Sequence, residues 1–161
     1  MKEKREIKQE KIYDKNNKLL YTIIPNYRKT DYFMSQNEIK FYKFLISTVK
    51  KIQEQYNLKL NVFTQVAINR IIKQNNEREK ELEKDIFAKS IDFVLYDIIK
   101  DEIYCCIELD GDEHKTDLNR IERDQTLDNI FRQVNIKLIH QKNQFNYSQE
   151  DFIKKILEKE G

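Results

Sequence analysis

The chain has 161 residues, and its 30 lysine and arginine residues against 28 aspartate and glutamate residues leave a formal net charge of +2. This length suits one domain with a buried core. The charge balance excludes a strongly basic coat protein and permits a nucleic-acid binder with local basic patches. With 36% charged residues, two glycines and one proline, the composition favours helices and regular strands over a loop-rich fold.

The cysteine and hydropathy patterns indicate a soluble, reduced, cytoplasmic protein. Cys105 and Cys106 are adjacent in a predicted strand, so their side chains point to opposite faces and are poorly placed to form a disulfide bond. The amino-terminal residues lack the apolar region of a signal peptide, and no stretch approaches the roughly 18 apolar residues of a membrane span.

Residues 1–34 are predicted to form a charged extension that contains a hairpin. Two short apolar runs flank an Asp-Lys-Asn-Asn turn in the segment KIYDKNNKLLYTII (11–24), a pattern typical of a β-hairpin. Pro25 closes this unit, and residues 26–34 are the predicted linker. The extension is also the expected place for docking onto a larger protein complex.

Residues 35–161 are predicted to form the main domain, of the α/β class, with a mixed β-sheet flanked by helices. A capping-box pattern, Ser35-x-x-Glu38, precedes the first helix. The remaining expected elements follow from apolar periodicity: a strand at 58–66, a helix at 67–83 whose charged run 76–85 is solvated, strands at 90–97 and 102–109, a helix at 117–134, a strand at 136–140, and a helix from Ser148.

The strands 90–97 and 102–109 are joined by a few residues, which predicts an antiparallel hairpin at the centre of the sheet. A three-residue loop makes Ile98 face Glu102 and places Asp92 opposite Glu108. Asp110 then lies on the same face as Glu108, because residues two apart in a strand share a face. Opposed residues have Cβ atoms about 5 Å apart, so three carboxylates are expected near one end of the sheet.

Three carboxylates in this arrangement predict a metal site. Like charges in a half-buried place repel and raise one another's pKa, and a divalent cation removes this penalty. Oxygen ligands suit Mg²⁺ or Mn²⁺, and Mg²⁺ leaves coordination positions for phosphates. The alternative interpretation is that Glu108 and Asp110 are solvated residues at a strand exit, while Asp92 pairs with a lysine.

The segment DFVLYD (92–97) followed by IELDGDEH (107–114) resembles the PD-(D/E)XK nuclease superfamily, in the branch similar to very-short-patch repair endonucleases and related bacterial domains of unknown function. The resemblance covers roughly residues 35–140. It implies a restriction-endonuclease-like core of αβββαβ order and metal-dependent endonuclease activity on DNA phosphodiesters. It also implies that Asp92 and Glu108 ligate Mg²⁺ or Mn²⁺.

The chain departs from the superfamily at one position, because the lysine expected two residues after Glu108 is Asp110 here. That lysine helps to orient or activate the attacking water, so its role falls to His114, Lys115 or Gln65 if the chain is active. Asp110 itself is expected to ligate a second metal or to orient a water.

Other residues complete the predicted site. His114 has an ordinary pKa near 6.5, which suits proton transfer, and the alternative is a surface histidine in an acidic loop. Gln65 is expected to hold a water or a phosphate, although a simple polar residue at a strand end is equally consistent. Lys115 and Arg123 are expected to contact DNA phosphates.

Arg120 and Asp124 fall on the core-facing stripe of the helix 117–134. They are expected to surround the acidic cluster and to contact the side chains that form it. The alternative is an ordinary ion pair between residues four apart in the helix. His140 ends an apolar strand and is given a structural role. Glu38 is explained by the capping box, although the superfamily often presents an acid from its first helix to the active site.

A binding module is the main rival to the nuclease hypothesis: a decayed nuclease fold that serves as a DNA-binding accessory subunit. The absent lysine favours this rival, whereas the intact set of Asp92, Glu108 and Asp110 opposes it. The sequence does not separate DNA from RNA as the substrate, because no feature identifies a group that reads a 2′-hydroxyl.

Overall fold

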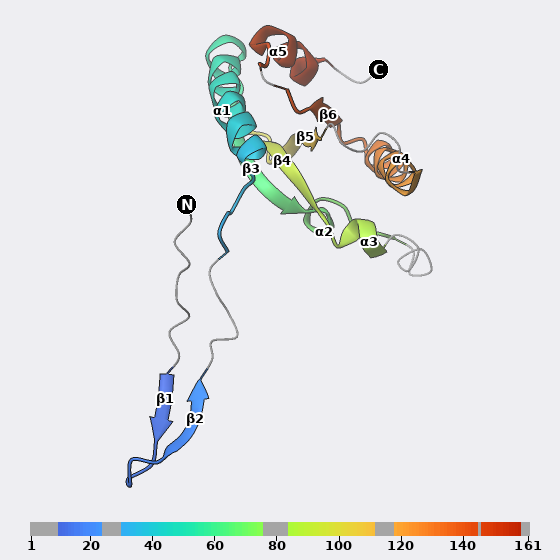
Figure 1. Cartoon of the computed structure of the whole chain (residues 1–161). Helices are drawn as coiled ribbons and strands as arrows, with labels where there is room; N and C mark the ends of the chain where they lie inside the picture. Colours follow the sequence, from blue (N-terminus) through green and yellow to red (C-terminus); the bar gives the residue numbers. More distant parts are fainter. Residues whose placement is uncertain (1–9, 24–29, 76–83, 112–117, 145, 159–161) are drawn as a thin grey trace. The chain divides into compact units, whose positions relative to one another are not determined.

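The structure is a computed structural model that describes residues 10–23, 30–75, 84–111, 118–144 and 146–158. The chain divides into two units, Met1–Met34 and Ser35–Gly161, and each is described by itself. In the first unit, the antiparallel strands β1 (Glu10–Tyr13) and β2 (Leu19–Ile23) form the predicted hairpin (Figure 1). No helix in the described ranges is long and apolar enough to cross a membrane.

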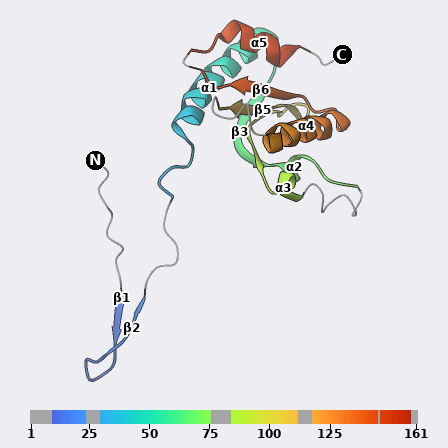
Figure 2. The ribbon, with the colours of Figure 1, turned by 45° about the vertical axis from the view of Figure 1, so that its right-hand side comes forward.

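The second unit is built on one mixed sheet. The strand order is β3-β4-β5-β6, in which β4 is antiparallel to β3 and β5, and β5 is parallel to β6. This four-stranded sheet with flanking helices confirms the predicted α/β class (Figure 2). The elements are α1 (Gln36–Tyr56), β3 (Leu60–Ala67), α2 (Ile68–Ile71), α3 (Lys84–Phe87), β4 (Ser90–Asp97), β5 (Glu102–Asp110), α4 (Leu118–Gln133), β6 (Leu138–Lys142) and α5 (Gln149–Leu157).

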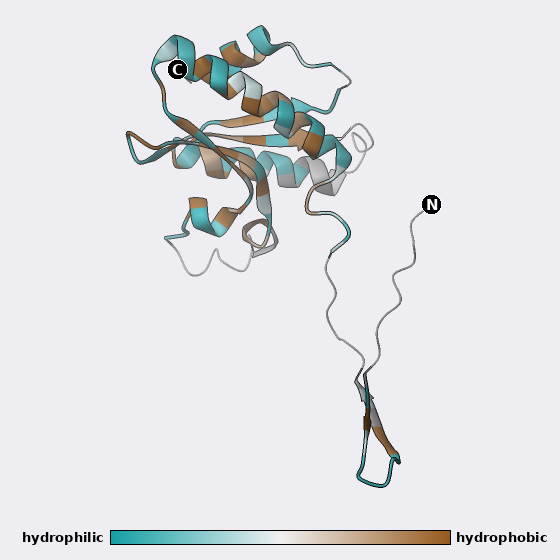
Figure 3. Cartoon of the chain, turned by 90° about the vertical axis from the view of Figure 1, so that its left-hand side faces the viewer, coloured by the Kyte–Doolittle hydropathy of each residue, from teal (hydrophilic) through white to brown (hydrophobic). Residues whose placement is uncertain are grey.

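Helices cover both faces of the sheet, and many residues of its strands are hydrophobic (Figure 3). On one face Phe41 of α1 contacts Phe93 of β4, with ring centroids 5.2 Å apart, and Phe152 of α5 at 5.5 Å. On the other face buried residues of α4 pack with Val94 and Cys106. The central strands are therefore shielded from water on both sides, which explains their nearly continuous apolar sequence.

The first helix begins as its capping box predicts. The Ser35 hydroxyl accepts a hydrogen bond from the Glu38 N–H at 3.2 Å, and the Glu38 carboxylate accepts one from the Ser35 N–H. This reciprocal pair satisfies two donors that a helix end otherwise leaves unpaired. It also fixes Glu38 at the start of α1.

The helix predicted over 67–83 is much shorter in the structure. Strand β3 continues to Ala67, only Ile68–Ile71 are helical, and residues 72–75 are irregular, while 76–83 lie outside the described residues. Ile68 and Ile72 are buried together with Ile86 in one apolar cluster. Tertiary packing of these isoleucines therefore overrides the local helical periodicity. The last strand is also displaced, since β6 begins at Leu138.

The turn between β4 and β5 is one residue longer than predicted. Asp97 pairs with Glu102, so the expectation that Ile98 faces Glu102 is wrong. The Asp97 carboxylate explains the difference, because its Oδ1 accepts hydrogen bonds from the N–H groups of Ile99 at 2.9 Å and Lys100 at 3.2 Å. This side chain stabilises a longer turn than the count of residues suggests.

A bulge in β5 restores the predicted alignment of the acids. Tyr104 is one extra residue on β5, and this shift offsets the extra residue of the turn. Beyond the bulge the strands stay in register as far as the pair of Phe93 and Ile107, and one further step places Asp92 beside Glu108. The pairs that flank the bulge are Tyr96–Ile103 and Leu95–Cys105.

Candidate functional site

A pocket of about 100 Å³ opens beside the ends of β4, β5 and β6, where the acids gather. Helix α4 contributes to its wall, as do apolar residues of α2 and α3. The polar lining consists of Lys89, Ser90, Glu108, Asp110, Asp124 and His140. The pocket therefore combines three carboxylates with a lysine, a hydroxyl and an imidazole.

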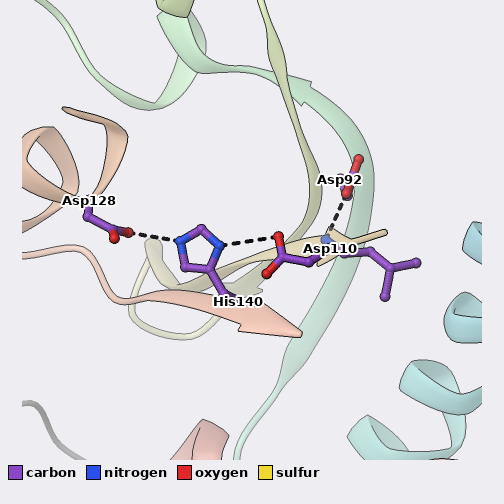
Figure 4. A network of polar contacts seen from close by, with 5 residues as sticks. Asp92, Asp110, Asp128 and His140 are labelled. Atoms are coloured by element: carbon purple, nitrogen blue, oxygen red, sulfur yellow. Dashed lines mark hydrogen bonds and ion pairs between the residues drawn. The ribbon is translucent and has the colours of Figure 1, made fainter. Parts of the chain in front are cut away.

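Asp92 is held by donors on both of its oxygens. Its Oδ2 accepts the Leu109 N–H at 2.8 Å (Figure 4), and its Oδ1 accepts the Gln65 amide at 3.2 Å. Burial raises the pKa of Asp92, and the charges of Glu38 and Asp110 add to the rise, while the two hydrogen bonds oppose it. The carboxylate is thus oriented precisely in a place that disfavours its charge.

Glu108 has the most strongly shifted carboxyl group among the described residues. Burial, helped by the neighbouring Asp92 and opposed by His140, raises its pKa from the ordinary 4.5 to about 8. Without a cation, this carboxyl group is largely protonated at neutral pH. Removal of the carboxylate from water is the main physical cause, and the charge of the second carboxylate adds to the cost.

Asp110 faces a histidine that joins it to α4. His140 Nδ1 lies 3.5 Å from Asp110 Oδ1, and His140 Nε2 lies 2.8 Å from Asp128 Oδ1 (Figure 4). Burial lowers the pKa of His140, but the contact with Asp128, aided by Asp110, outweighs burial and leaves the pKa raised. Carboxylates only accept hydrogen bonds, so both contacts are satisfied when the ring carries two protons.

Gln65 bridges two carboxylates from a left-handed backbone. Its φ is 54°, which is uncommon for a residue that is not glycine and frequently marks a functional position. Its amide nitrogen donates to both Glu38 and Asp92, while its Oε1 accepts the Ser90 hydroxyl at 2.8 Å. Glu38 therefore both caps α1 and reaches the site, a second role that the capping box alone did not predict.

The acids do not form a complete metal cage. Among the described residues, no three His, Cys, Asp or Glu side chains are grouped so that they could hold a metal ion. The reason is that Asp92 turns toward Leu109 and Gln65, whereas Asp110 turns toward His140. A pair of carboxylates still fits Mg²⁺, which commonly uses one or two and takes its other ligands from water and phosphate.

The structure brings together most of the predicted residues that it describes. Asp124 lines the same pocket as Glu108 and Asp110, in agreement with its expected place behind the acidic cluster. His114 and Lys115 lie outside the described residues, and so do the side chains of Arg120 and Arg123 on α4.

His140 is the residue that sequence reasoning placed in a structural role and that the structure places in the site. It pairs with Glu108 across the parallel strands β5 and β6, so both side chains lie on one face. A signal was present, because His140 is one of only two histidines and belongs to the strand that follows the acidic run and the helix after it. Its partner Asp128, one helical turn after Asp124, carried no distinguishing pattern.

Comparison with known proteins identifies the chain's family. A family model described as "Protein of unknown function (DUF2726)" matches residues 30–159. No curated protein and no solved structure gives a significant match. The matched region contains the whole candidate site, from Glu38 to His140, and excludes the hairpin. The chain therefore belongs to the DUF2726 family of proteins of unknown function.

Proposed function

We propose that this chain is a metal-dependent endonuclease with a restriction-endonuclease-like core, and that it hydrolyses DNA phosphodiester bonds. One observation carries the proposal: Asp92 and Glu108 occupy neighbouring positions on the two central strands, and Glu108 lines a pocket together with Asp110. The order α1, β3, β4, β5, α4, β6, with the short helices α2 and α3 between β3 and β4, supports the proposed core, since its main elements follow the αβββαβ order that the resemblance implies.

Asp92 and Glu108 would hold Mg²⁺ or Mn²⁺. When bound, the ion would supply positive charge for the phosphate and lower the pKa of a water molecule. The donors fit such an ion because both are hard oxygen ligands. The pKa values of both groups are raised, mainly by burial and also by neighbouring carboxylates, and a bound cation would offset both effects.

The other residues of the site would orient the reacting groups. Gln65 and the Leu109 N–H fix the Asp92 carboxylate, so little reorganisation is needed on binding. His140 fixes Asp110, which would then accept a hydrogen bond from the attacking water. Lys89, exposed at the pocket, would meet a phosphate oxygen.

The predicted site residues whose side chains the structure does not describe keep their proposed roles. His114 would assist proton transfer to the leaving group, while Lys115 and Arg123 would contact phosphates along the DNA backbone. Arg120 would support the acidic cluster together with Asp124.

The test is nicking of supercoiled plasmid DNA by the full chain with Mg²⁺ or Mn²⁺, with and without EDTA. The variants Asp92→Asn and Glu108→Gln should lose at least about 100-fold in nicking rate. Loss of a residue that only supports a metal ligand costs up to about 100-fold, so loss of a ligand itself should cost at least as much. Glu102→Gln is the matched control, since Glu102 is an exposed acid on the same strand β5. Undiminished nicking by Glu108→Gln would exclude the proposed site. A parallel assay with a labelled RNA of the same sequence tests whether the chain cleaves DNA or RNA.

A catalytically decayed DNA-binding subunit is the second candidate function. Two observations favour it: an aspartate, Asp110, stands where the motif lysine is expected, and the described residues contain no group of three metal ligands. A decayed module would bind DNA without nicking it. Its melting temperature would also stay the same when Mn²⁺ is added. A chain with a metal site would instead gain RT ln(1 + [L]/Kd) in the free energy of unfolding.

A further inference from the structure

The positive charge of this chain is concentrated in the segment that precedes the family match. Residues 1–29 contain nine lysine and arginine residues against four acids, a net charge of +5. The remaining 132 residues contain 21 basic residues against 24 acids, a net charge of −3. The matched family region begins at residue 30, so the basic segment is an addition to the region that carries the candidate site.

The described part of this segment is a hairpin whose turn is held by its own hydrogen bonds. Asp14 Oδ1 accepts the N–H groups of Asn16 and Lys18, both at 2.8 Å, and Asn17 takes a left-handed φ of 63°. The turn thereby satisfies its own backbone groups without any partner. Its other side chains are exposed, among them Lys15 and Lys18 with the two asparagines between them.

The hairpin also leaves apolar and basic side chains in water. Leu20 is 57% exposed and Tyr13 is 48% exposed, and Lys11 is exposed on the first strand. A two-stranded hairpin is only marginally stable alone in water. A partner that accepts a basic ribbon would therefore stabilise it as well as bind it.

We propose that residues 10–23 form a ribbon that binds duplex DNA, with Lys11, Lys15 and Lys18 on backbone phosphates. The major groove of B-form DNA is wide enough for a two-stranded β-ribbon, whereas that of A-form RNA is too narrow and deep. Asparagine amides both donate and accept hydrogen bonds, as base edges require. The carboxylates of an acidic protein surface would offer acceptors alone, so Asn16 and Asn17 between two lysines favour DNA.

This inference goes beyond the proposed nuclease and does not depend on cleavage. Because the ribbon and the candidate site belong to one chain, DNA held by the ribbon is present at a high effective concentration near the site. Under the nuclease proposal, loss of the ribbon's lysines would raise KM and leave kcat unchanged.

The experiment is fluorescence anisotropy of the full chain with a 30-base-pair DNA duplex, in EDTA, over a series of KCl concentrations. One variant carries Lys11→Gln, Lys15→Gln and Lys18→Gln. The control variant changes the same charge elsewhere, at exposed lysines of α1 and α5: Lys43→Gln, Lys50→Gln and Lys154→Gln. Amide NMR shifts of Asp14 and Asn17 verify that the turn of the hairpin variant stays folded.

Each phosphate contact contributes about 0.9 to the slope of log Kd against log salt. Loss of three contacts should therefore make the slope of the hairpin variant smaller by about 2 to 3. We also expect this variant to bind the duplex at least about ten-fold more weakly than the wild type at 100 mM KCl. The control should keep the wild-type slope to within about 1. Equal losses in both variants, or no loss in the hairpin variant, would overturn the proposal.

Two further outcomes also decide against it. No binding of the wild type to DNA at 50 mM KCl would refute the proposal and indicate a protein partner for the hairpin. An RNA duplex of the same length that binds equally well, with the same dependence on the three lysines, would refute the assignment to the DNA groove. Because the assay contains EDTA, which removes Mg²⁺ and Mn²⁺, it measures DNA binding apart from the proposed nuclease activity.

Discussion

Replacement of Glu108 by glutamine should change how the stability of the metal-free protein depends on pH. Burial raises the pKa of Glu108 in the folded protein to about 8, above the ordinary 4.5. Between these two pH values the folded state retains a proton that the unfolded chain has released. The free energy of unfolding therefore falls as the pH rises from about 4.5 through about 8, because the unfolded state binds fewer protons.

The size of this effect follows from the shift. Each pKa unit corresponds to about 1.4 kcal/mol, so the ceiling is on the order of 5 kcal/mol. Part of the rise comes from Asp92, which can itself take up a proton and so reduce the net cost. We therefore expect Glu108→Gln to be more stable than the wild type by about 2–4 kcal/mol at pH 9, and equal to it within about 1 kcal/mol at pH 5.

Urea unfolding in EDTA at pH 5, 7 and 9 measures the difference directly. The comparison cancels the titration of Asp92 and His140 to first order, because both groups remain in the variant. The control is Glu102→Gln, on the same strand but exposed, which should follow the wild type at all three pH values. Parallel pH profiles for the wild type and Glu108→Gln would refute the assignment of a costly buried carboxylate to this position. Addition of Mn²⁺ at pH 8 should stabilise the wild type and not the variant.

Three further outcomes are expected. The pKa of His140, followed by NMR titration, should fall more in Asp128→Asn than in Asp110→Asn, since the contact distances are 2.8 Å and 3.5 Å; equal falls would contradict the geometry. Gln65→Glu should destabilise the metal-free protein by about 1–3 kcal/mol at pH 8 in urea unfolding, because a carboxylate would then face Asp92, and a neutral effect would argue against the bridge. The thiol of Cys105 is fully buried and burial raises its pKa to about 12, so it should react with a thiol reagent at pH 8 only after unfolding; rapid labelling of the native protein would show that β5 opens readily.

Sequence reasoning succeeded where local chemistry determines structure. The capping box of Ser35 and Glu38 and the apolar strands around the acids are formed by residues close in the chain. Alternation and end signals therefore predicted them. The helix expected after Ala67 failed because the burial of Ile68 and Ile72 depends on Ile86, which is distant in sequence.

The candidate site was predicted in part for the same reason. Asp92 and Glu108 belong to one hairpin, so a residue count could align them. The approach of His140 to Asp110 depends on the parallel pairing of β5 with β6 across an intervening helix, and no local pattern encodes that register. The contact of Gln65 with Glu38 likewise joins β3 to α1 through a left-handed backbone.

The bulge at Tyr104 gives the hairpin one residue that it can lose without disturbing the acids. Deletion of Tyr104 alone would leave a regular ladder, because its flanking pairs Tyr96–Ile103 and Leu95–Cys105 already use neighbouring residues of β4. Glu108 would then still lie beside Asp92. A deletion between Cys105 and Glu108 has no such spare residue, and it would turn Glu108 to the opposite face of the sheet because neighbouring side chains alternate. A change of one residue in length is thus tolerated at the bulge and not between the bulge and Glu108.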